Sequence, residues 1–310
     1  MTRRHNVSRT RKDHMTATDA PPGSATRGVL RASRPRQWSK NLLVLAAPVL
    51  SGELTHGDVV WHTVVAFVAF CCAASGVYLI NDAGDIEADR AHPTKRNRPI
   101  AAGVVSTRTA YTVGVVLNIA AVAVSFLAGW ELAAVVATYL VLSAAYSRWL
   151  KHEPVLDIAI IATGFLLRAI AGGAASGIEL SQWFLLSASF GSLFMAAGKR
   201  YAEAALTEPG LVRRSLTKYT PTYLRFVWTM SAGLLIMTYG LWAFELNDAA
   251  TGSPLFVASM APFVLAVLRY AVSIDAGVAG EPEEIALRDR VLQVLALVWL
   301  LLVAGAVYLG

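Results

Sequence analysis

Apolar stretches of similar length recur along the chain and are separated by shorter polar segments. An α-helix needs roughly 20 mainly apolar residues to cross the hydrocarbon core of a bilayer. The pattern predicts nine such helices, over residues 38–54, 60–81, 107–128, 131–149, 155–175, 182–198, 221–244, 254–273 and 288–309. The first stretch is the weakest, because its strictly apolar part from Leu42 to Leu50 is too short to span alone. It must recruit Trp38 to Asn41 or lie partly in a polar cavity.

Composition supports an integral membrane protein. Of the 310 residues, 55% are hydrophobic and 15% are charged, whereas soluble domains contain about 25% charged residues. The mean hydropathy of +0.51 also excludes a disordered chain, because disorder requires low hydrophobicity and high charge. The two cysteines, Cys71 and Cys72, are neighbours in one apolar stretch, which excludes a disulfide scaffold. We therefore predict an all-α integral membrane protein.

Basic residues indicate the orientation of the helices. Lys and Arg occur in every second connection between the predicted spans, and the alternate connections contain none. Because basic loops stay in the cytoplasm, we expect the N-terminus in the cytoplasm and the C-terminus outside, in the plasma (inner) membrane. Residues 1–28 are basic and polar, and we expect them to form a mobile cytoplasmic tail. Residues 29–310 are expected to form a single nine-helix transmembrane domain.

Four oxygen-bearing side chains gather where the second predicted span ends: Asn81, Asp82, Asp85 and Asp89. If the helix continues, their spacing places all four on one helical face. Carboxylates one turn apart repel each other, and a divalent cation such as Mg²⁺, shared with a diphosphate, removes that cost. We nominate all four as metal ligands and the three aspartates as catalytic residues. The alternative is a solvated helix end that Arg90, Lys95 and Arg96 neutralise.

A basic loop follows, from His92 to Pro99, with prolines that break the helix. Lys95, Arg96 and Arg98 are three cations within four residues beside the predicted metal face. Such a group is suited to holding phosphate oxygens, so we nominate these residues for substrate binding. The alternative is that they only fix the membrane topology.

These motifs resemble the UbiA-type prenyltransferase superfamily. The run from Asn81 to Asp89 at the end of the second span and the following Arg-Pro loop resemble its first aspartate-rich motif. The segment from Tyr146 to Lys151 is similar to its Tyr-x-x-x-x-Lys connection. The resemblance implies a UbiA-like helical bundle with Mg²⁺-dependent transfer in a cavity that opens to the cytoplasm. Residues 29–310 would be the catalytic domain, and Tyr146 and Lys151 would bind substrate.

One departure from the superfamily follows the sixth span. Its members mostly carry a second aspartate-rich motif there, which holds Mg²⁺ on a prenyl diphosphate. This chain has Gly198 to Glu203 instead, with Lys199 and Arg200 as cations and Glu203 as the one acid. The exchange suits a donor with an additional phosphate. We nominate Lys199, Arg200 and Glu203 for substrate binding.

A closer resemblance is to an actinobacterial family, the decaprenyl-phosphate phosphoribosyltransferases. It rests on the run from Arg34 to Asn41, on 92–99, 198–203 and 223–228, and on the run from Gly280 to Arg290. It implies transfer of 5-phosphoribosyl from 5-phosphoribosyl 1-diphosphate to decaprenyl phosphate, for synthesis of cell-wall arabinan. Lys40 and Asn41 join the substrate-binding nominees.

The sequence leaves open the isoprenoid length, the number of Mg²⁺ ions, and whether the chain is a monomer or a homo-oligomer; no nucleic-acid partner is expected.

The fifth predicted span contains two further candidate residues. Asp157 opens the fifth span and Arg168 lies three turns further along, so we nominate both as cavity residues. We expect Arg168 to line the cavity or to pair with an acid; the alternative is that it binds a phosphate directly. The acidic and basic run from Glu281 to Arg290 is expected either to cover the site or to form a solvated loop.

Rival functions are transfer from a prenyl diphosphate to an aromatic acceptor and, in a different class, transport of a lipid or solute.

Overall fold

The computed structural model describes residues 22–206, 218–248, 253–280, 285–286 and 288–309, and these residues form helices and connections without a strand. The α-helices are α1 (Pro22–Ala32), α2 (Ala46–Leu50), α3 (Gly57–Gly84), α4 (Ile86–Ala91), α5 (Thr107–Ser125), α6 (Trp130–Arg148), α7 (Leu156–Ser176), α8 (Gln182–Leu206), α9 (Pro221–Asp248), α10 (Leu255–Asp275) and α12 (Arg290–Tyr308). Five 3₁₀ segments connect or extend them: η1 (Pro35–Leu45), η2 (Glu53–Thr55), η3 (Lys95–Asn97), η4 (Phe126–Ala128) and η5 (Leu150–His152). The all-helical prediction is confirmed.

Within the described residues, seven helices are long and apolar enough to cross a membrane: α3, α5 with η4, α6, α7, α9, α10 and α12. They correspond to seven of the nine predicted spans. The sixth predicted span forms α8, which has 25 residues and carries Lys199, Arg200 and Glu203 in its C-terminal third. It is not among the seven. The count of nine spans stays a prediction.

The first predicted span is not one regular α-helix. It consists of η1 followed by the short α2, in agreement with the shortness of its apolar part. Arg34 precedes Pro35 with a left-handed backbone (φ 53°), so the chain turns sharply before η1 starts. At Gly172 of α7, an added Cβ would lie 2.0 Å from the Val44 carbonyl oxygen. The glycine therefore permits the close approach that holds η1 against α7.

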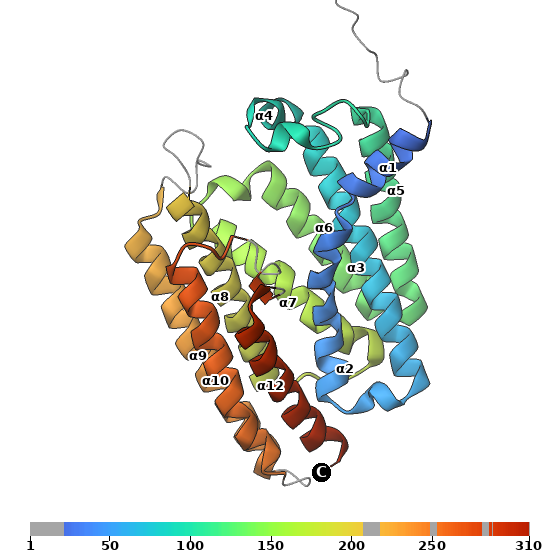
Figure 1. Cartoon of the computed structure of the whole chain (residues 1–310). Coiled ribbons are helices and arrows are strands. Elements are labelled where there is room, and N and C mark those ends of the chain that lie inside the picture. The colour runs from blue at the N-terminus through green and yellow to red at the C-terminus, as the bar shows by residue number, and fades with distance from the viewer. Residues whose placement is uncertain (1–21, 207–217, 249–252, 281–284, 287, 310) are drawn as a thin grey trace, which may run out of the picture.

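Two apolar cores are joined by α7. One core contains Phe70 of α3 and Leu132 of α6, and the other contains Phe194 of α8 and Ile274 of α10. Ala171 of α7 belongs to the first core, and the start of α7 belongs to the second. Figure 1 shows α7 in the middle of the molecule, with α3, α5 and α6 on one side and α8, α9 and α10 on the other.

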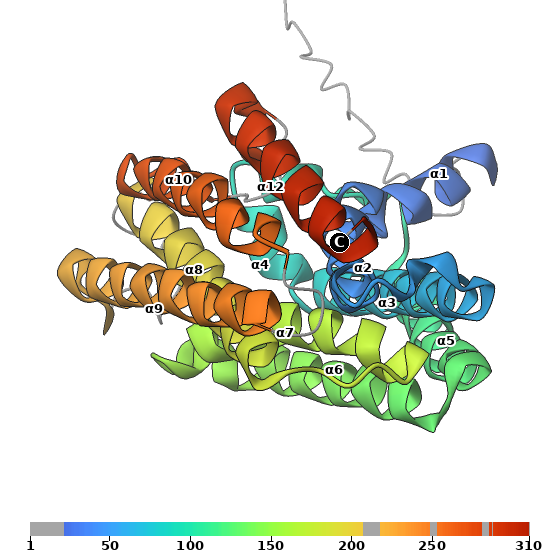
Figure 2. The same cartoon turned by 90° about the horizontal axis from the view of Figure 1, so that it is seen from below.

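The two ends of the bundle differ. Figure 1 places α1 and α4 at its upper end and the C-terminal end of α12 at its lower end, and Figure 2 shows the helices from that lower end. Apolar side chains on α12, such as Val294, Leu297 and Leu301, are exposed, which fits a surface that faces lipid. Most of the predicted 1–28 tail, residues 1–21, lies outside the described residues, and α1 begins at Pro22. Residues 281–284 of the 281–290 run also lie outside them.

Candidate functional site

A cavity of about 610 Å³ lies between η1, the end of α3, α4, α6, α7 and α8. This volume is within the range of ligand pockets in proteins. Its charged lining is markedly unequal, with three aspartates and eight Lys and Arg side chains: Asp82, Asp85, Asp89, Arg34, Lys40, Lys95, Arg98, Lys151, Arg168, Lys199 and Arg200. The cavity therefore favours a polyanionic ligand.

The acidic residues lie where α3 gives way to α4. The helix does not run on unbroken, because α3 ends at Gly84 and Asp85 adopts a non-helical backbone (φ −96°, ψ 15°) before α4 starts. The amide of Asp85 still donates to the Asn81 carbonyl at 2.9 Å, and the amide of Asp89 donates to the Asp85 carbonyl at 2.9 Å. The break is thus a small bend, and Asn81, Asp82, Asp85 and Asp89 all line the cavity.

Two arginines neutralise the buried acids. Nη2 of Arg34 donates to Oδ1 of Asp82 at 2.6 Å. Nη1 of Arg98 lies between two carboxylates, 3.1 Å from Oδ1 of Asp82 and 2.6 Å from Oδ2 of Asp89. Asp82 and Asp89 are 4% and 3% exposed, so without these partners both charges would be strongly disfavoured.

The same carboxylates are the candidates for a metal ion. Their oxygens are the donors that Mg²⁺ takes in proteins, and the Asp82 and Asp89 carboxylates already converge on one positive centre, Nη1 of Arg98. Within the described residues, however, no three or more His, Cys, Asp or Glu side chains are arranged to hold a metal. These oxygen donors suit Mg²⁺. An ion could bind the Asp82 and Asp89 oxygens only if Arg98 moved away from them.

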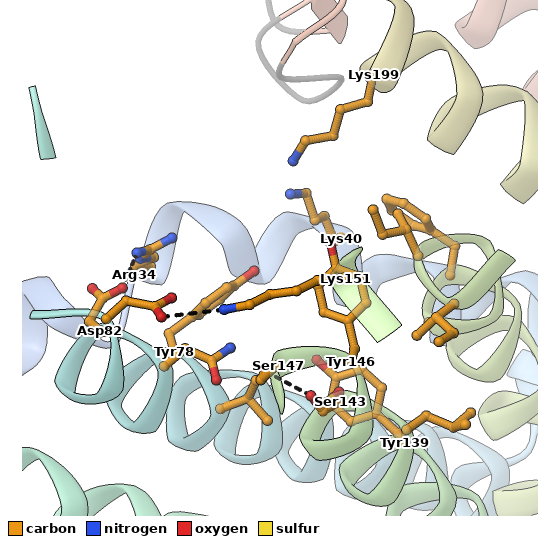
Figure 3. A pocket seen from close by; sticks show the side chains of 18 of the residues that line it. Arg34, Lys40, Tyr78, Asp82, Tyr139, Ser143, Tyr146, Ser147, Lys151 and Lys199 are labelled. Carbon is orange, nitrogen blue, oxygen red and sulfur yellow. Dashed lines mark hydrogen bonds and ion pairs between the residues drawn. The ribbon is translucent and has the colours of Figure 1, made fainter. Parts of the chain in front are cut away.

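Three lysines reach into the cavity from different elements. Figure 3 shows the side chains of Lys40 (η1), Lys151 (η5) and Lys199 (α8) directed into the same space. Nζ of Lys151 lies 3.3 Å from Oδ1 of the half-exposed Asp85, and Lys40 donates to Gln37. Primary ammonium groups on long flexible stems can follow phosphate oxygens as a substrate moves.

Arg200 occupies a different environment from Lys199. It is 1% exposed, and its Nε lies 3.0 Å from Oδ2 of the buried Asp157 at the start of α7. It also donates to Glu203 and, at 2.7 Å, to the hydroxyl of Tyr146. This network joins α6, α7 and α8, and all three guanidinium nitrogens of Arg200 contact groups within the protein.

Tyr219 completes the network from the segment before α9. Its hydroxyl donates to Oδ1 of Asp157 and accepts from the amide of Val155. Val155 has a positive φ of 67°, which is uncommon for a β-branched residue, and this hydrogen bond helps to hold it. Burial, and next the hydrogen bond to Asp157, raise the pKa of Tyr219, so its hydroxyl stays protonated near neutral pH.

The inner end of the cavity contains Arg168. Its guanidinium is hydrogen-bonded to Asn41 and Tyr139, and it is not paired with Asp157, which is bound to Arg200. The cavity thus brings together most of the nominated residues. Four do not line it: Asn41, Arg96, Asp157 and Glu203.

Arg34 is the main residue that sequence reasoning did not nominate. It stands 48 residues before Asp82, and nothing in the local sequence connects the two. The one local indication of its importance was that Arg34 directly precedes Pro35, shortly before the weakest predicted span begins. His92 also lines the cavity; burial, and next Lys95, lower its pKa.

Comparison with known families and curated proteins gives consistent matches. The profile of the UbiA prenyltransferase family matches residues 42–288. The decaprenyl-phosphate phosphoribosyltransferase of Mycolicibacterium smegmatis is 54% identical over 304 residues, covering 94% of this chain and 96% of that protein. The enzyme of the same name from Corynebacterium glutamicum is 51% identical over 312 residues, covering 97% and 94%. That from Mycobacterium tuberculosis H37Rv is 54% identical over 296 residues, covering 94% and 97%.

Solved structures show the same fold at low sequence identity. A UbiA homologue from Archaeoglobus fulgidus bound to GPP and Mg²⁺ superposes with a TM-score of 0.70 at 17% identity, covering 90% of this chain and 98% of that one. A digeranylgeranylglyceryl phosphate synthase superposes with a TM-score of 0.68 at 16% identity, covering 92% and 99%.

Proposed function

The chain belongs to the UbiA prenyltransferase family, and from this premise we propose that it transfers a 5-phosphoribosyl group from 5-phosphoribosyl 1-diphosphate to decaprenyl phosphate. The products are decaprenylphosphoryl-5-phosphoribose and diphosphate. The names of relatives that are 51–54% identical over nearly the whole chain support this reaction. The structural observation that carries it is a cavity in which eight cationic side chains face three aspartates.

The charge of the lining matches the charge of the reactants. The donor carries a diphosphate at C1 and a phosphate at C5, and the acceptor is a phosphate monoester. Two polyanions must therefore approach each other, and cations on several elements reduce their mutual repulsion. Lys40, Lys151 and Lys199 are suited to this task because they reach the cavity from η1, η5 and α8.

The reaction breaks the bond between C1 and the diphosphate oxygen and forms a bond between C1 and an oxygen of the acceptor phosphate. The electron pair of the broken bond leaves with the diphosphate, and C1 acquires oxocarbenium character. The second pKa of a phosphate monoester is about 6, so the acceptor is already largely a dianion at neutral pH. No side chain has to remove a proton, and we assign no general base.

Mg²⁺ fits this site under the same proposal. Asp82 and Asp89, with Asn81 and Asp85 beside them, would hold the ion, and the ion would neutralise charge on the diphosphate. Arg98 would then be released from the two buried carboxylates. Its guanidinium is suited to bidentate contact with phosphate oxygens.

The location of the cavity supports its cytoplasmic placement. The acidic residues lie beside α4, at the end of the bundle opposite the C-terminal end of α12 (Figure 1). By the positive-inside rule, the end with the basic 92–99 loop faces the cytoplasm. We therefore infer that the donor enters from the cytoplasm and that the acceptor reaches the cavity from the lipid, with its isoprenoid tail between helices.

A turnover assay tests the proposal. The purified full-length protein in detergent with Mg²⁺ is given labelled 5-phosphoribosyl 1-diphosphate with decaprenyl phosphate, or geranyl diphosphate with an aromatic acid. We expect transfer of labelled sugar phosphate into the lipid fraction, with release of one diphosphate per product. Turnover with geranyl diphosphate alone would overturn the proposal, as would solute uptake into vesicles without any chemical turnover.

A further inference from the structure

The inner end of the cavity contains Arg168, which lies deep along α7. Arg168 is 6% exposed and lines the cavity from α7. From Asp157 to Arg168 the helix advances eleven residues, or about 16 Å at ~1.5 Å per residue. Its partner ring on α6, Tyr139, is seven residues before Tyr146, or about 10 Å along that helix. The guanidinium therefore lies two to three turns below the level of the Asp157–Arg200 pair.

The described groups that contact this guanidinium are neutral. Nε donates to Oδ1 of Asn41 at 2.7 Å, Nη2 donates to the hydroxyl of Tyr139 at 3.2 Å, and Nη1 donates to the carbonyl of Gly164. The rings of Tyr139 and Phe70 lie 4.8 and 5.4 Å from Cζ. In the part of the chain that the structure describes, no carboxylate forms an ion pair with Arg168.

The other arginines of the cavity differ in this respect. Arg34, Arg98 and Arg200 each form an ion pair with at least one aspartate or glutamate. A buried charge without a counter-charge is costly, and more so at membrane depth. An arginine has five N–H donors, of which three are engaged here, so two remain for a ligand. The charge and the remaining donors both suit an anion in the cavity.

We propose that Arg168, oriented by Asn41 and Tyr139, binds a phosphate monoester at the inner end of the cavity. The inference rests on the proposed function, whose two substrates each carry one such group: the 5-phosphate of the sugar donor and the phosphate of the polyprenyl acceptor. The diphosphate of the donor belongs at the other end, beside Asp82 and Asp89. A guanidinium fork recognises phosphate oxygens better than a single ammonium group does.

Calorimetric titration of the full-length protein in detergent tests the subsite. The probes are ribose 5-phosphate, farnesyl phosphate and inorganic diphosphate, and the variants are Arg168→Gln and Asn41→Asp. Arg168→Gln removes the positive charge. Asn41→Asp places a carboxylate beside Arg168, and this carboxylate has nearly the same shape as the Asn41 amide. The matched control is Arg269→Gln, because Arg269 is exposed on α10, pairs with Asp289 and does not line the cavity.

We expect Arg168→Gln to lose about tenfold to a hundredfold in affinity for one of the two monoesters. Its affinity for inorganic diphosphate should stay close to that of the wild type, as should all affinities of Arg269→Gln. Asn41→Asp should lose affinity for the same monoester without a lower melting temperature. Loss confined to ribose 5-phosphate assigns the subsite to the donor, and loss confined to farnesyl phosphate assigns it to the acceptor.

The inference is overturned if the wild type binds neither monoester, or if the folded variants bind both as the wild type does. In the second case Arg168 is held by the aromatic rings for structural reasons. If Arg168→Gln does not fold, Asn41→Asp decides alone, because an added counter-charge beside Arg168 should not destabilise the fold. A failure of the proposed function can be distinguished from a failure of the subsite. Turnover with geranyl diphosphate only would refute the proposed reaction. If the variants still lost monoester affinity, the subsite proposal would stand.

Discussion

Arg200 of α8 forms an ion pair with Asp157 of α7 at 3.0 Å, and both side chains are almost fully buried. Its neighbour Lys199 lines the cavity beside it and is directed into the space that Lys40 and Lys151 also reach (Figure 3). Successive helical residues point in directions about 100° apart. The two adjacent cations therefore lie in different surroundings, and we infer that they have separate tasks.

Substitution of the two cations should separate these tasks. Lys199→Gln should raise the KM for the sugar donor about tenfold to a hundredfold, because a charge-assisted hydrogen bond is lost, and should leave the melting temperature unchanged. Arg200→Gln should instead destabilise the fold by about 3–5 kcal/mol, because Asp157 is left buried without its partner. Steady-state kinetics and thermal unfolding of both variants check this. The reverse assignment of effects would contradict the buried network.

Asp85→Asn should lower kcat by about 10²–10³-fold, the typical effect of removing one electrostatic contributor to a transition state. Folding should be unaffected, because Asp85 is half-exposed and its partner is Lys151. Kinetics at saturating Mg²⁺ measure the effect. Glu87→Gln is the matched control, since Glu87 lies two residues further along in α4, is 85% exposed and pairs with Arg90. Near-normal turnover of Asp85→Asn would remove the metal assignment.

Arg98→Gln should bind a divalent cation more tightly when no substrate is present. The guanidinium now lies 2.6–3.1 Å from an oxygen of both Asp82 and Asp89, and it competes with any cation for these oxygens. We expect roughly tenfold tighter binding of Mn²⁺, measured by electron paramagnetic resonance. Arg90→Gln is the control, because Arg90 contacts Glu87 and the Ala101 carbonyl instead. Weaker binding in Arg98→Gln would show that Arg98 holds the carboxylates in place.

Alkaline pH should destabilise the protein through Tyr219. Its pKa is raised in the folded state by burial and by the hydrogen bond to Asp157. The stability that this tyrosine contributes is present below its unfolded pKa of about 10 and is lost as pH rises towards the folded value. The melting temperature of the wild type should therefore fall more steeply above pH 10 than that of Tyr219→Phe. Parallel curves for the two proteins would show that the hydroxyl does not titrate in this way.

Cysteine labelling checks the orientation of the bundle. In a Cys71→Ser, Cys72→Ser background, a cysteine at the exposed Ala102 should react with a membrane-impermeant maleimide only from the cytoplasmic side. A cysteine at the exposed Ser181, before α8, should react only from the outside. The opposite pattern would place the acidic end of the cavity outside the cell.

The sequence contained much of this organisation. Apolar periodicity located the long helices, and the spacing of Asn81, Asp82, Asp85 and Asp89 placed them together on the cavity, because helical geometry is local. The first span was recognised as too short in its apolar part, but its actual form, η1 followed by α2, was not predicted.

Partners that depend on packing between distant helices could not be predicted. The Arg34–Asp82 contact joins residues 48 positions apart, and Arg168 meets Asn41 across 127 positions. Asp157 and Arg168 were expected on similar faces of one helix, yet Asp157 pairs with Arg200 of α8 and Arg168 donates to Asn41 of η1. Side-chain direction in a bundle is decided by which neighbour each helix face meets, and a single sequence does not specify that.

The excess of cations over acids in the cavity has a kinetic consequence. A concave, partly apolar wall concentrates the field of its charges, and such fields raise association rates with oppositely charged ligands by about 10–10³-fold. The capture of a small polyanion from solution should therefore slow steeply as ionic strength rises, because the Debye length shrinks from about 10 Å at 0.1 M to about 3 Å at 1 M. The field does not raise the association rate of an uncharged solute of the same size. The lining therefore discriminates between solutes by their association rates, in addition to how well they fit the cavity.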